Sequence, residues 1–469
     1  MKRVAAISIL TAFTLASCSS VQPAAPSVSS QYTSKETQVS SPAVRGEDIE
    51  LTMAINGYNP YIINGTDMVE KFNDADNGYK IILKDYAEGM SFEKPAEQEV
   101  IDAADLQLSL DIMKGEVIDI IPNVFRDMGK YDSLAQKGAF VDLNTFLDSD
   151  EEINHETLFD NVLRVCELNG KLFYMPLGFS IDTLVGPTKY VGSKENWTFE
   201  EMKERWENMP EGSTISRHKV KDYVYFTILR GCLSSFIDYE NAECHFDSDE
   251  FIDMLKFIDS FDSSGGYKDE GSWDAPVFVI DVPIYGFTNF HYGYIQETYG
   301  TEEPVTFVGY PSEDGCGSFI NVREHQIAVS AMSSEEKQRG AWEFMKTLLS
   351  YECQCDSLYF EGEEKEEAAF PVNMAAFEKR GADQYENEGK SNKTMHNMEE
   401  MDEGYLTKAE YDRLVGLINS IKTVNNELDN DVFDVINEEI YSMFAGEKTA
   451  EEVAEMIQNR VQILVSEKS

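Results

Sequence analysis

The stretch Ile49-Glu-Leu-Thr-Met-Ala-Ile-Asn-Gly57 decides the fold class of this chain. Its large apolar side chains stand at every second position, which is the period of a strand that buries one face. Asn-Gly is a turn signal and ends the strand pattern. A short helical pattern from Met68 to Phe72 and a second strand pattern from Tyr79 to Leu83 follow. The segment therefore predicts a strand, a helix and a second strand in succession.

A longer helix and a third strand extend this pattern. The helix is expected from Glu99 to Lys114, with Gly115 where a C-terminal cap belongs. Its apolar face is expected to consist of Leu106, Leu110 and Met113. Val117 to Ile121 is apolar apart from Asp119, as in a strand covered on both faces. Three strands joined by helices within about 75 residues predict a parallel sheet with right-handed crossovers, whose ligands bind beyond the carboxyl ends of the strands.

The composition predicts a large, acidic, folded protein. Asp and Glu total 86 residues against 39 Lys and Arg, which gives a formal net charge of −47. Such a surface repels phosphate groups, so the composition argues against binding to DNA or RNA. Hydrophobic residues make up 42% of the chain. About 420 residues after the N-terminal segment exceed the usual size of one core, so two or more lobes are expected.

The N-terminal segment has the pattern of a secretion signal. Lys2 and Arg3 precede an apolar run, which is too short to be an ordinary membrane-spanning helix. The run ends in Leu15-Ala-Ser-Cys18, which resembles the lipobox of bacterial lipoproteins. The resemblance implies a signal peptide over residues 1–17 and a diacylglycerol on Cys18, which would hold the protein on the extracellular face of the cell membrane. Residues 18–48, rich in Ser, Pro and Ala, are expected to form a flexible tether.

Cysteine and histidine spacing indicates no metal site and no cofactor. The six cysteines beyond Cys18 are scattered, and Cys232 with Cys244 is the pair to test first for a disulfide. Cys353 and Cys355 have the wrong spacing for a zinc knuckle, and the six histidines form no HExxH motif.

Several later segments resemble a known family when they are taken in order. They are Tyr131–Leu143, Leu168-Asn-Gly-Lys-Leu-Phe-Tyr-Met-Pro176, Thr198-Phe-Glu-Glu201, Gly309–Gly315, Ile327–Ser330, Ala341–Lys346 and Phe370-Pro371. This order is similar to that of the extracellular solute-binding proteins of ABC importers, in particular the sugar-binding group that includes maltodextrin-binding proteins. The resemblance implies a two-lobed α/β fold of the periplasmic-binding-protein type (class II), in which each lobe is a mainly parallel sheet flanked by helices.

The same resemblance implies how the chain divides between the lobes. Residues 49–165 and 309–351 are expected to form lobe 1, and residues 166–308 and 352–469 are expected to form lobe 2. The crossings would then lie near Cys166, Val308 and Tyr351. The resemblance further implies a monomer that traps its solute in the cleft by hinge closure, and closure requires that the solute binds the closed form more tightly than the open form.

The remaining sequence patterns concern helix starts and one acidic stretch. Capping-box patterns begin at Thr198, Ser333 and Thr449. Residues 382–403 are polar and acidic, which indicates a surface loop or flap whose role the sequence leaves open.

The predicted ligand-binding residues follow strand ends and aromatic clusters. A sugar suits such a cleft because its ring faces stack on aromatic side chains while polar side chains bind its hydroxyls. From the first lobe the predicted residues are Tyr58, Asn59 and Asn123. From the second lobe they are Ser180, Asp182, Trp273, Tyr285, Asn289 and Tyr292. The aromatic members could instead serve packing, and the identity of the solute stays open.

The function implied by the resemblance is that of a membrane-anchored extracellular subunit, which captures a carbohydrate, expected to be an oligosaccharide, and delivers it to ABC permease subunits. One alternative is a surface glycan-binding or sensor lipoprotein that is not coupled to transport. Another is a surface hydrolase. No catalytic residue is predicted, because the chain has no GxSxG motif and its histidines are scattered.

Overall fold

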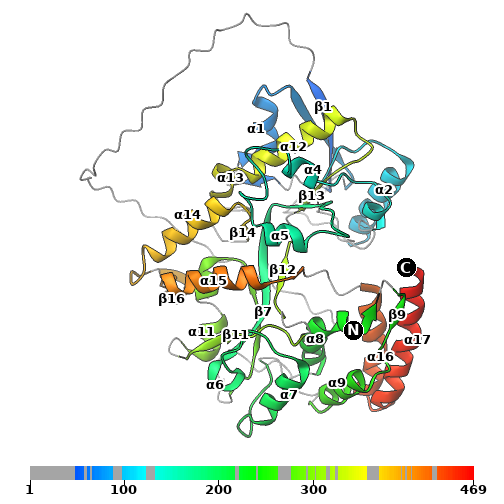
Figure 1. The fold of residues 1–469 in the computed structure, drawn as a ribbon, viewed down its shortest axis with the longest axis vertical. Helices are drawn as coiled ribbons and strands as arrows, with labels where there is room; N and C mark the ends of the chain where they lie inside the picture. The colour runs from blue at the N-terminus through cyan, green and yellow to red at the C-terminus, as the bar shows by residue number, and fades with distance from the viewer. Residues whose placement is uncertain are drawn as a thin grey trace, which may run out of the picture.

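The structure is a computed structural model of the chain, and it describes most of residues 48–468. The described ranges are 48–56, 61–63, 66–87, 98–122, 133–216, 221–238, 241–261, 276–291, 294–300, 303–312, 317–322, 326–355, 369–391, 393–396, 399–402, 404–424 and 430–468. The expected signal peptide, Cys18 and the tether up to residue 47 lie outside these ranges. Figure 1 shows two groups of elements, one above the other, with strand β7 reaching from one group to the other.

The first sheet has five strands in the order β4-β1-β5-β13-β6. β1 (Ile49–Ile55) lies between β4 (Tyr79–Asp85) and β5 (Ile120–Pro122), and both pairings are parallel, as predicted. β5 begins three residues later than expected. β13 (Gln326–Val329) pairs antiparallel with both β5 and β6 (Met175–Pro176), so later parts of the chain complete the sheet.

Three helices accompany the first sheet. They are α1 (Met68–Asp74), α2 (Gln98–Lys114) and α12 (Glu335–Leu349). Asp67 caps α1 by accepting hydrogen bonds from the N–H groups of Val69 and Glu70, and Gly115 follows α2 with a φ of 79°. Figure 1 shows α1 and α12 close together and α2 at the side of the sheet.

The predicted apolar face of α2 is not the buried one. Leu106 and Met113 are 52% and 62% exposed and Leu110 is half-buried, whereas Ala104 and Leu108 pack in the core. The buried side also carries Asp111, whose carboxylate accepts hydrogen bonds from Lys84, Tyr86 and Gln107 at 2.6–3.0 Å. Burial alone would raise the pKa of Asp111, but these bonds hold it below its usual value. The expected stripe is therefore wrong, because a satisfied carboxylate occupies the side that covers the sheet.

The second sheet is built around β7 (Gly178–Pro187), its long central strand. Four strands pair with it antiparallel: β10 (Ile280–Ile284), β11 (Val305–Phe307), β12 (Phe319–Asn321) and β14 (Phe370–Pro371). β17 (Thr423–Val424) lies parallel to β12. This sheet differs from the expected mainly parallel arrangement, because the chain returns beside β7 in the opposite direction each time.

A second core fills the space between this sheet and five helices. They are α7 (Phe199–Glu207), α8 (Lys221–Cys232), α9 (Asp249–Asp259), α16 (Asn430–Phe444) and α17 (Ala450–Lys468). The predicted capping boxes at Thr198 and Thr449 are present. The one predicted at Ser333 is wrong, since Ser334 caps α12 by accepting from the N–H of Lys337, and the Ser333 hydroxyl binds Asp119.

The remaining elements are short or peripheral. The helices are α4 (Asn144–Leu147), α5 (Asp160–Val165), α6 (Thr188–Val191), α10 (Phe287–His291), α11 (Tyr294–Tyr299), α13 (Tyr351–Cys355), α14 (Met374–Tyr385), α15 (Lys408–Ser420) and the 3-10 turn Leu233–Phe236. The strands are β2 (Ile62–Ile63), β3 (Thr66–Asp67), β8 (Ile237–Asp238), β9 (Glu243–Cys244), β15 (Lys393–His396) and β16 (Glu399–Asp402). The acidic stretch 382–403 thus contains the end of α14 and a β15–β16 hairpin.

Cys232 and Cys244, the pair predicted for a disulfide test, are not bonded to each other. Cys232 lies at the end of α8 and donates to the carbonyl oxygen of Pro311 at 3.0 Å. Cys244 lies in β9 against α17, where its thiol contacts Gln458 and Gln462. The two thiols are therefore held by separate partners.

The division of the chain between lobes stays a prediction. β6 (Met175–Pro176) lies in the first sheet, so a division by sheet would place the first crossing at Leu177 and not near Cys166. The segment 309–351 supplies β12 to the second sheet and β13 to the first, so the same division would assign residues up to Asn321 to the second lobe. Within the part of the chain that the structure describes, no helix is both long and apolar enough to cross a membrane.

Candidate functional site

One face of the second sheet brings together polar side chains from two strands. In β7, Ser180 lies opposite Asn321 of β12, and Asp182 lies opposite Phe319. Residues that face each other in an antiparallel pair project to the same side of the sheet. The amide nitrogen of Asn321 accordingly donates to a carboxylate oxygen of Asp182 at 3.3 Å. We call Ser180, Asp182 and Asn321 the polar face.

Tyr285 lies just beyond the end of β10 and is partly exposed. Pro283 of β10 lies opposite Asp182, β10 ends at Ile284, and Tyr285 directly follows it. Its side chain is 39% exposed. Its backbone N–H donates to the side-chain oxygen of Asn289 in α10 at 3.2 Å. Of the four predicted residues that the structure describes, Ser180 and Asp182 thus lie in β7, whereas Tyr285 follows β10 and Asn289 lies in α10.

The other side of the same strands is buried and mainly apolar, although it includes Thr183, whose hydroxyl bonds that of Ser318 at 2.8 Å. It carries Ile181, Val185, Val282, Ile284 and Ile320, all in the core. On the polar face Asp182 is only 5% exposed, and Ser180 and Asn321 are half-buried. This alternation fixes the register, because a slip by one residue would move these polar side chains into the apolar core.

Two further hydrogen bonds hold the elements beside the polar face. The hydroxyl of the buried Tyr310 donates to Asp281 of β10 at 2.7 Å. His291, the last residue of α10, bonds the carboxylate of Glu410 at 2.9 Å and so ties α10 to α15. Burial would raise the pKa of Glu410, but the bonds from His291 and Thr407 lower it.

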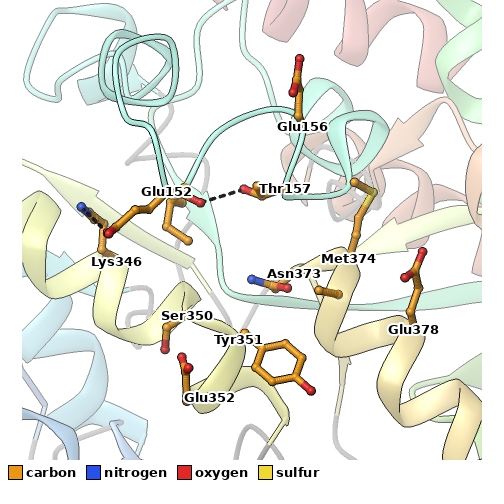
Figure 2. Close-up of a pocket in the computed structure, with 12 residues that line it drawn as sticks. Glu152, Glu156, Thr157, Lys346, Ser350, Tyr351, Glu352, Asn373, Met374 and Glu378 are labelled. Atoms are coloured by element: carbon orange, nitrogen blue, oxygen red, sulfur yellow. Dashed lines mark hydrogen bonds and ion pairs between the residues drawn. The ribbon is translucent and has the colours of Figure 1, made fainter. Parts of the chain in front are cut away.

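A separate hollow of about 620 Å³ opens near the ends of α12 and α14. Figure 2 shows its carboxylates, Glu152, Glu156, Glu352 and Glu378, around Tyr351 and Asn373. Lys346 lies 3.1 Å from Glu152 and 3.1 Å from Asp150, so its charge is balanced there. None of the four predicted residues that the structure describes lines this hollow.

The other five predicted residues lie outside the described ranges. They are Tyr58, Asn59, Asn123, Trp273 and Tyr292. Three of them follow strands that the structure does describe. Tyr58 and Asn59 come soon after the end of β1, and Asn123 directly follows β5. Since β1 and β5 are parallel, their carboxyl ends meet at the same edge of the first sheet.

Sequence reasoning missed Asn321, Asp281 and Tyr310. Asn321 ends the strand Phe319–Asn321, and a polar residue at a strand end is the signal that could have identified it. Asp281 and Tyr310 become neighbours only through the fold. Among the described residues, no group of three or more His, Cys, Asp or Glu side chains could hold a metal ion.

Comparisons with known proteins rest on structure. No protein-family model matches the chain, and no curated protein matches its sequence. A periplasmic oligogalacturonide-binding protein from Yersinia enterocolitica has a TM-score of 0.55 at 14% identity, with 90% of this chain and 100% of that chain covered. A family 1 extracellular solute-binding protein from Alicyclobacillus acidocaldarius has a TM-score of 0.53 at 12% identity, with 90% of this chain and 99% of that chain covered. A cyclic α-maltosyl-1,6-maltose-binding protein from Arthrobacter globiformis has a TM-score of 0.51 at 14% identity, covering 90% and 100%.

The chain has the two-lobed α/β fold of extracellular solute-binding proteins. The two-lobed α/β fold expected from the sequence is therefore confirmed, whereas the second sheet is mainly antiparallel and not mainly parallel. A designed cysteine esterase also has a similar fold, with a TM-score of 0.55 at 13% identity and 90% and 99% of the two chains covered. Because one fold can host different activities, function has to be argued from the site.

Proposed function

We propose that the protein captures a carbohydrate between its two lobes. The observation that carries this proposal is the polar face beside the exposed ring of Tyr285, on a sheet that is joined directly to the first sheet. Carboxylate, amide and hydroxyl groups can bind sugar hydroxyls, and an exposed aromatic ring can stack on the apolar face of a sugar ring. Two structural neighbours are an oligogalacturonide-binding protein and a cyclic α-maltosyl-1,6-maltose-binding protein, and this supports a carbohydrate as the solute.

The second half of the binding site is proposed for the first lobe. Tyr58, Asn59 and Asn123 would contact the solute from the carboxyl edge of the first sheet. A solute that touches both lobes binds the closed form more tightly than the open form, and this difference in affinity is what shifts the equilibrium towards closure. The division of residues 49–165 with 309–351, and 166–308 with 352–469, between the lobes belongs to this proposal.

We also propose a membrane anchor and delivery to a permease. A lipid on Cys18 would keep the protein on the extracellular face of the membrane, with acyl chains contributing about 0.8 kcal/mol per buried methylene. The tether of residues 18–48 would span about 30 Å as a random coil. That reach would let the captured solute meet ABC permease subunits. The protein is proposed to act as a monomer without a cofactor and without catalysis.

A thermal-shift screen tests the proposal. The chain from Glu47 onward is heated with a panel of oligosaccharides, and one of them should raise the melting temperature, because a ligand at 100 times its dissociation constant adds about 2.7 kcal/mol of stability. If a peptide or a polyamine raises the melting temperature and no sugar does, the solute is not a carbohydrate and belongs to that other class. Product analysis after incubation tests the hydrolase alternative, since cleavage of the bound sugar would support an enzyme. Copurification with permease subunits separates a transport subunit from an uncoupled sensor.

A further inference from the structure

The first connection between the two sheets consists of one residue. β6 ends at Pro176 in the first sheet, and β7 begins at Gly178 in the second. Leu177 lies between them and is buried. Any rotation of one sheet against the other that passes through this connection must therefore change the backbone dihedral angles at or beside Leu177.

A buried glutamine holds the carbonyl group of Leu177. Gln354 of α13 is 0% exposed. Its side-chain nitrogen donates to the carbonyl oxygen of Leu177 at 2.7 Å and to that of Leu348 in α12 at 3.1 Å. Its side-chain oxygen accepts from the backbone N–H of Asn373 at 3.1 Å. Both amide protons and the oxygen are thus used, and they join three segments that are distant in sequence.

Asn373 continues the same network towards the second sheet. Its side-chain nitrogen donates to the carbonyl oxygen of Leu349 at 3.0 Å, and its side-chain oxygen accepts from Ala376 and caps α14. Asn373 follows β14 with only Val372 between them, and β14 pairs with the start of β7. The two amides therefore connect the end of α12, which packs on the first sheet, with the strands that begin the second.

We propose that Gln354 and Asn373 form a hinge latch that sets the angle between the lobes through Leu177. They are positioning residues, because neither belongs to the polar face. The inference rests on the proposed capture by closure, and it states where the rotation is controlled. A buried carbonyl group without a donor is unfavourable, so the native angle at Leu177 is the one that keeps the bond from Gln354. Loss of the latch releases that constraint.

The distribution of distances between the lobes in the solute-free protein tests this latch. Nitroxide labels are attached through an unnatural amino acid at Glu70 in α1 and Glu204 in α7, and pulsed electron resonance measures the distance between them. The unnatural amino acid avoids labelling the native cysteines. Gln354→Met keeps the volume of the side chain but removes its hydrogen bonds. We expect a broader distance distribution with a shifted mean.

Gln458→Met is the matched control. Gln458 in α17 also donates to a backbone carbonyl group, that of Cys244 at 2.8 Å, and accepts from a backbone N–H, that of Phe246 at 2.6 Å. All three residues lie around the second core, so this variant should lower the melting temperature and leave the distance distribution unchanged. A general loss of stability therefore cannot imitate the effect expected for Gln354→Met.

A second variant protects the test against misfolding. Gln354→Leu also removes both donors, including the one to Leu177, and it should broaden the distribution in the same way. A distribution like that of the wild type in a folded Gln354 variant would overturn the latch. That outcome would leave the proposed solute capture standing, since no solute is used. Conversely, a screen in which no sugar binds would not change the interpretation of the distances, because they are measured in the solute-free protein.

Discussion

The carboxylate of Asp119 and the ammonium group of Lys337 lie 2.9 Å apart, although 218 residues separate them in the sequence. Asp119 is 0% exposed and also accepts from the backbone N–H of Thr52 at 2.7 Å and from the hydroxyl of Ser333. Asp119 directly precedes β5, and its carboxylate thus joins β1 to the first turn of α12. It holds the returning part of the chain on the first sheet.

Asp119→Asn should cost about 3 kcal/mol in the free energy of unfolding, because breaking a buried ion pair leaves buried groups without their partners. Urea denaturation measures the loss. Asp383→Asn is the control, since the pair of Lys379 and Asp383 on α14 is exposed and should contribute less than about 0.5 kcal/mol. Equal losses in the two variants would show that Asp119 does not hold the sheet and α12 together.

Acid should weaken the contact between Asp150 and α12. Burial alone would raise the pKa of Asp150, but hydrogen bonds from the N–H groups of Ile153 and Glu152, from the Trp342 indole and from Lys346 lower it from 3.8 to about 2. A lowered pKa in the folded state adds stability above pH 4, and this contribution of about 2 kcal/mol is lost as the pH falls from about 4 to about 2.

Urea unfolding of the wild type and of Asp150→Asn, followed by tryptophan fluorescence between pH 5 and pH 2, checks this prediction. The difference in stability between the two proteins should shrink as the pH falls. The exposed Asp74→Asn is the control and should leave the pH profile unchanged. A difference between Asp150→Asn and the wild type that stays constant down to pH 2 would refute the prediction.

Two helical glycines should respond in opposite directions to alanine. A Cβ atom at Gly231 in α8 would lie 2.3 Å from the carbonyl oxygen of Pro311, whereas a Cβ atom at Gly416 in α15 would meet nothing within 4 Å. Gly231→Ala should destabilise the protein by about 3 kcal/mol through overpacking, and Gly416→Ala should stabilise it by about 0.5–1 kcal/mol. Thermal unfolding of both variants checks the pair, and an unchanged Gly231→Ala would disprove the close packing.

Tyr285 and Tyr351 distinguish the polar face from the hollow. Both rings are partly exposed, at 39% and 42%. Once the screen has found a sugar, Tyr285→Ala should weaken its binding about tenfold, since an aromatic stacking contact contributes about 0.5–1.5 kcal/mol. Tyr351→Ala should leave the dissociation constant unchanged in a calorimetric titration. The reverse result would place the solute in the hollow beside α13.

The order of elements in the first lobe could be predicted from the sequence because local patterns determine it. The alternation from Ile49 to Ile55 and the glycine after Lys114 gave the correct strand and helix ends. Periodicity could not show which side of α2 is buried, because Asp111 is buried only when Lys84 and Tyr86 of another segment satisfy it. The capping-box pattern at Ser333 fails for a similar reason, since the hydroxyl of Ser333 binds Asp119 across the fold.

The candidate site was predictable only in part. Ser180 and Asp182 follow the segment Leu168–Pro176 that suggested entry into the second lobe, and the structure places them on one side of β7. Asn321 could not be added to them from the sequence, because its place opposite Ser180 depends on the register of two strands about 140 residues apart. The latch residue Gln354 carried no sequence signal, since its partners come from three separate segments.

Small-angle X-ray scattering with and without a stabilising oligosaccharide tests the central claim most directly. If the protein captures a carbohydrate by closure of its lobes, the sugar that raises the melting temperature should also reduce the radius of gyration at saturation. A control sugar that causes no thermal shift should leave the radius unchanged. Strong sugar binding with an unchanged radius of gyration, or no sugar binding across a broad panel, would contradict the account.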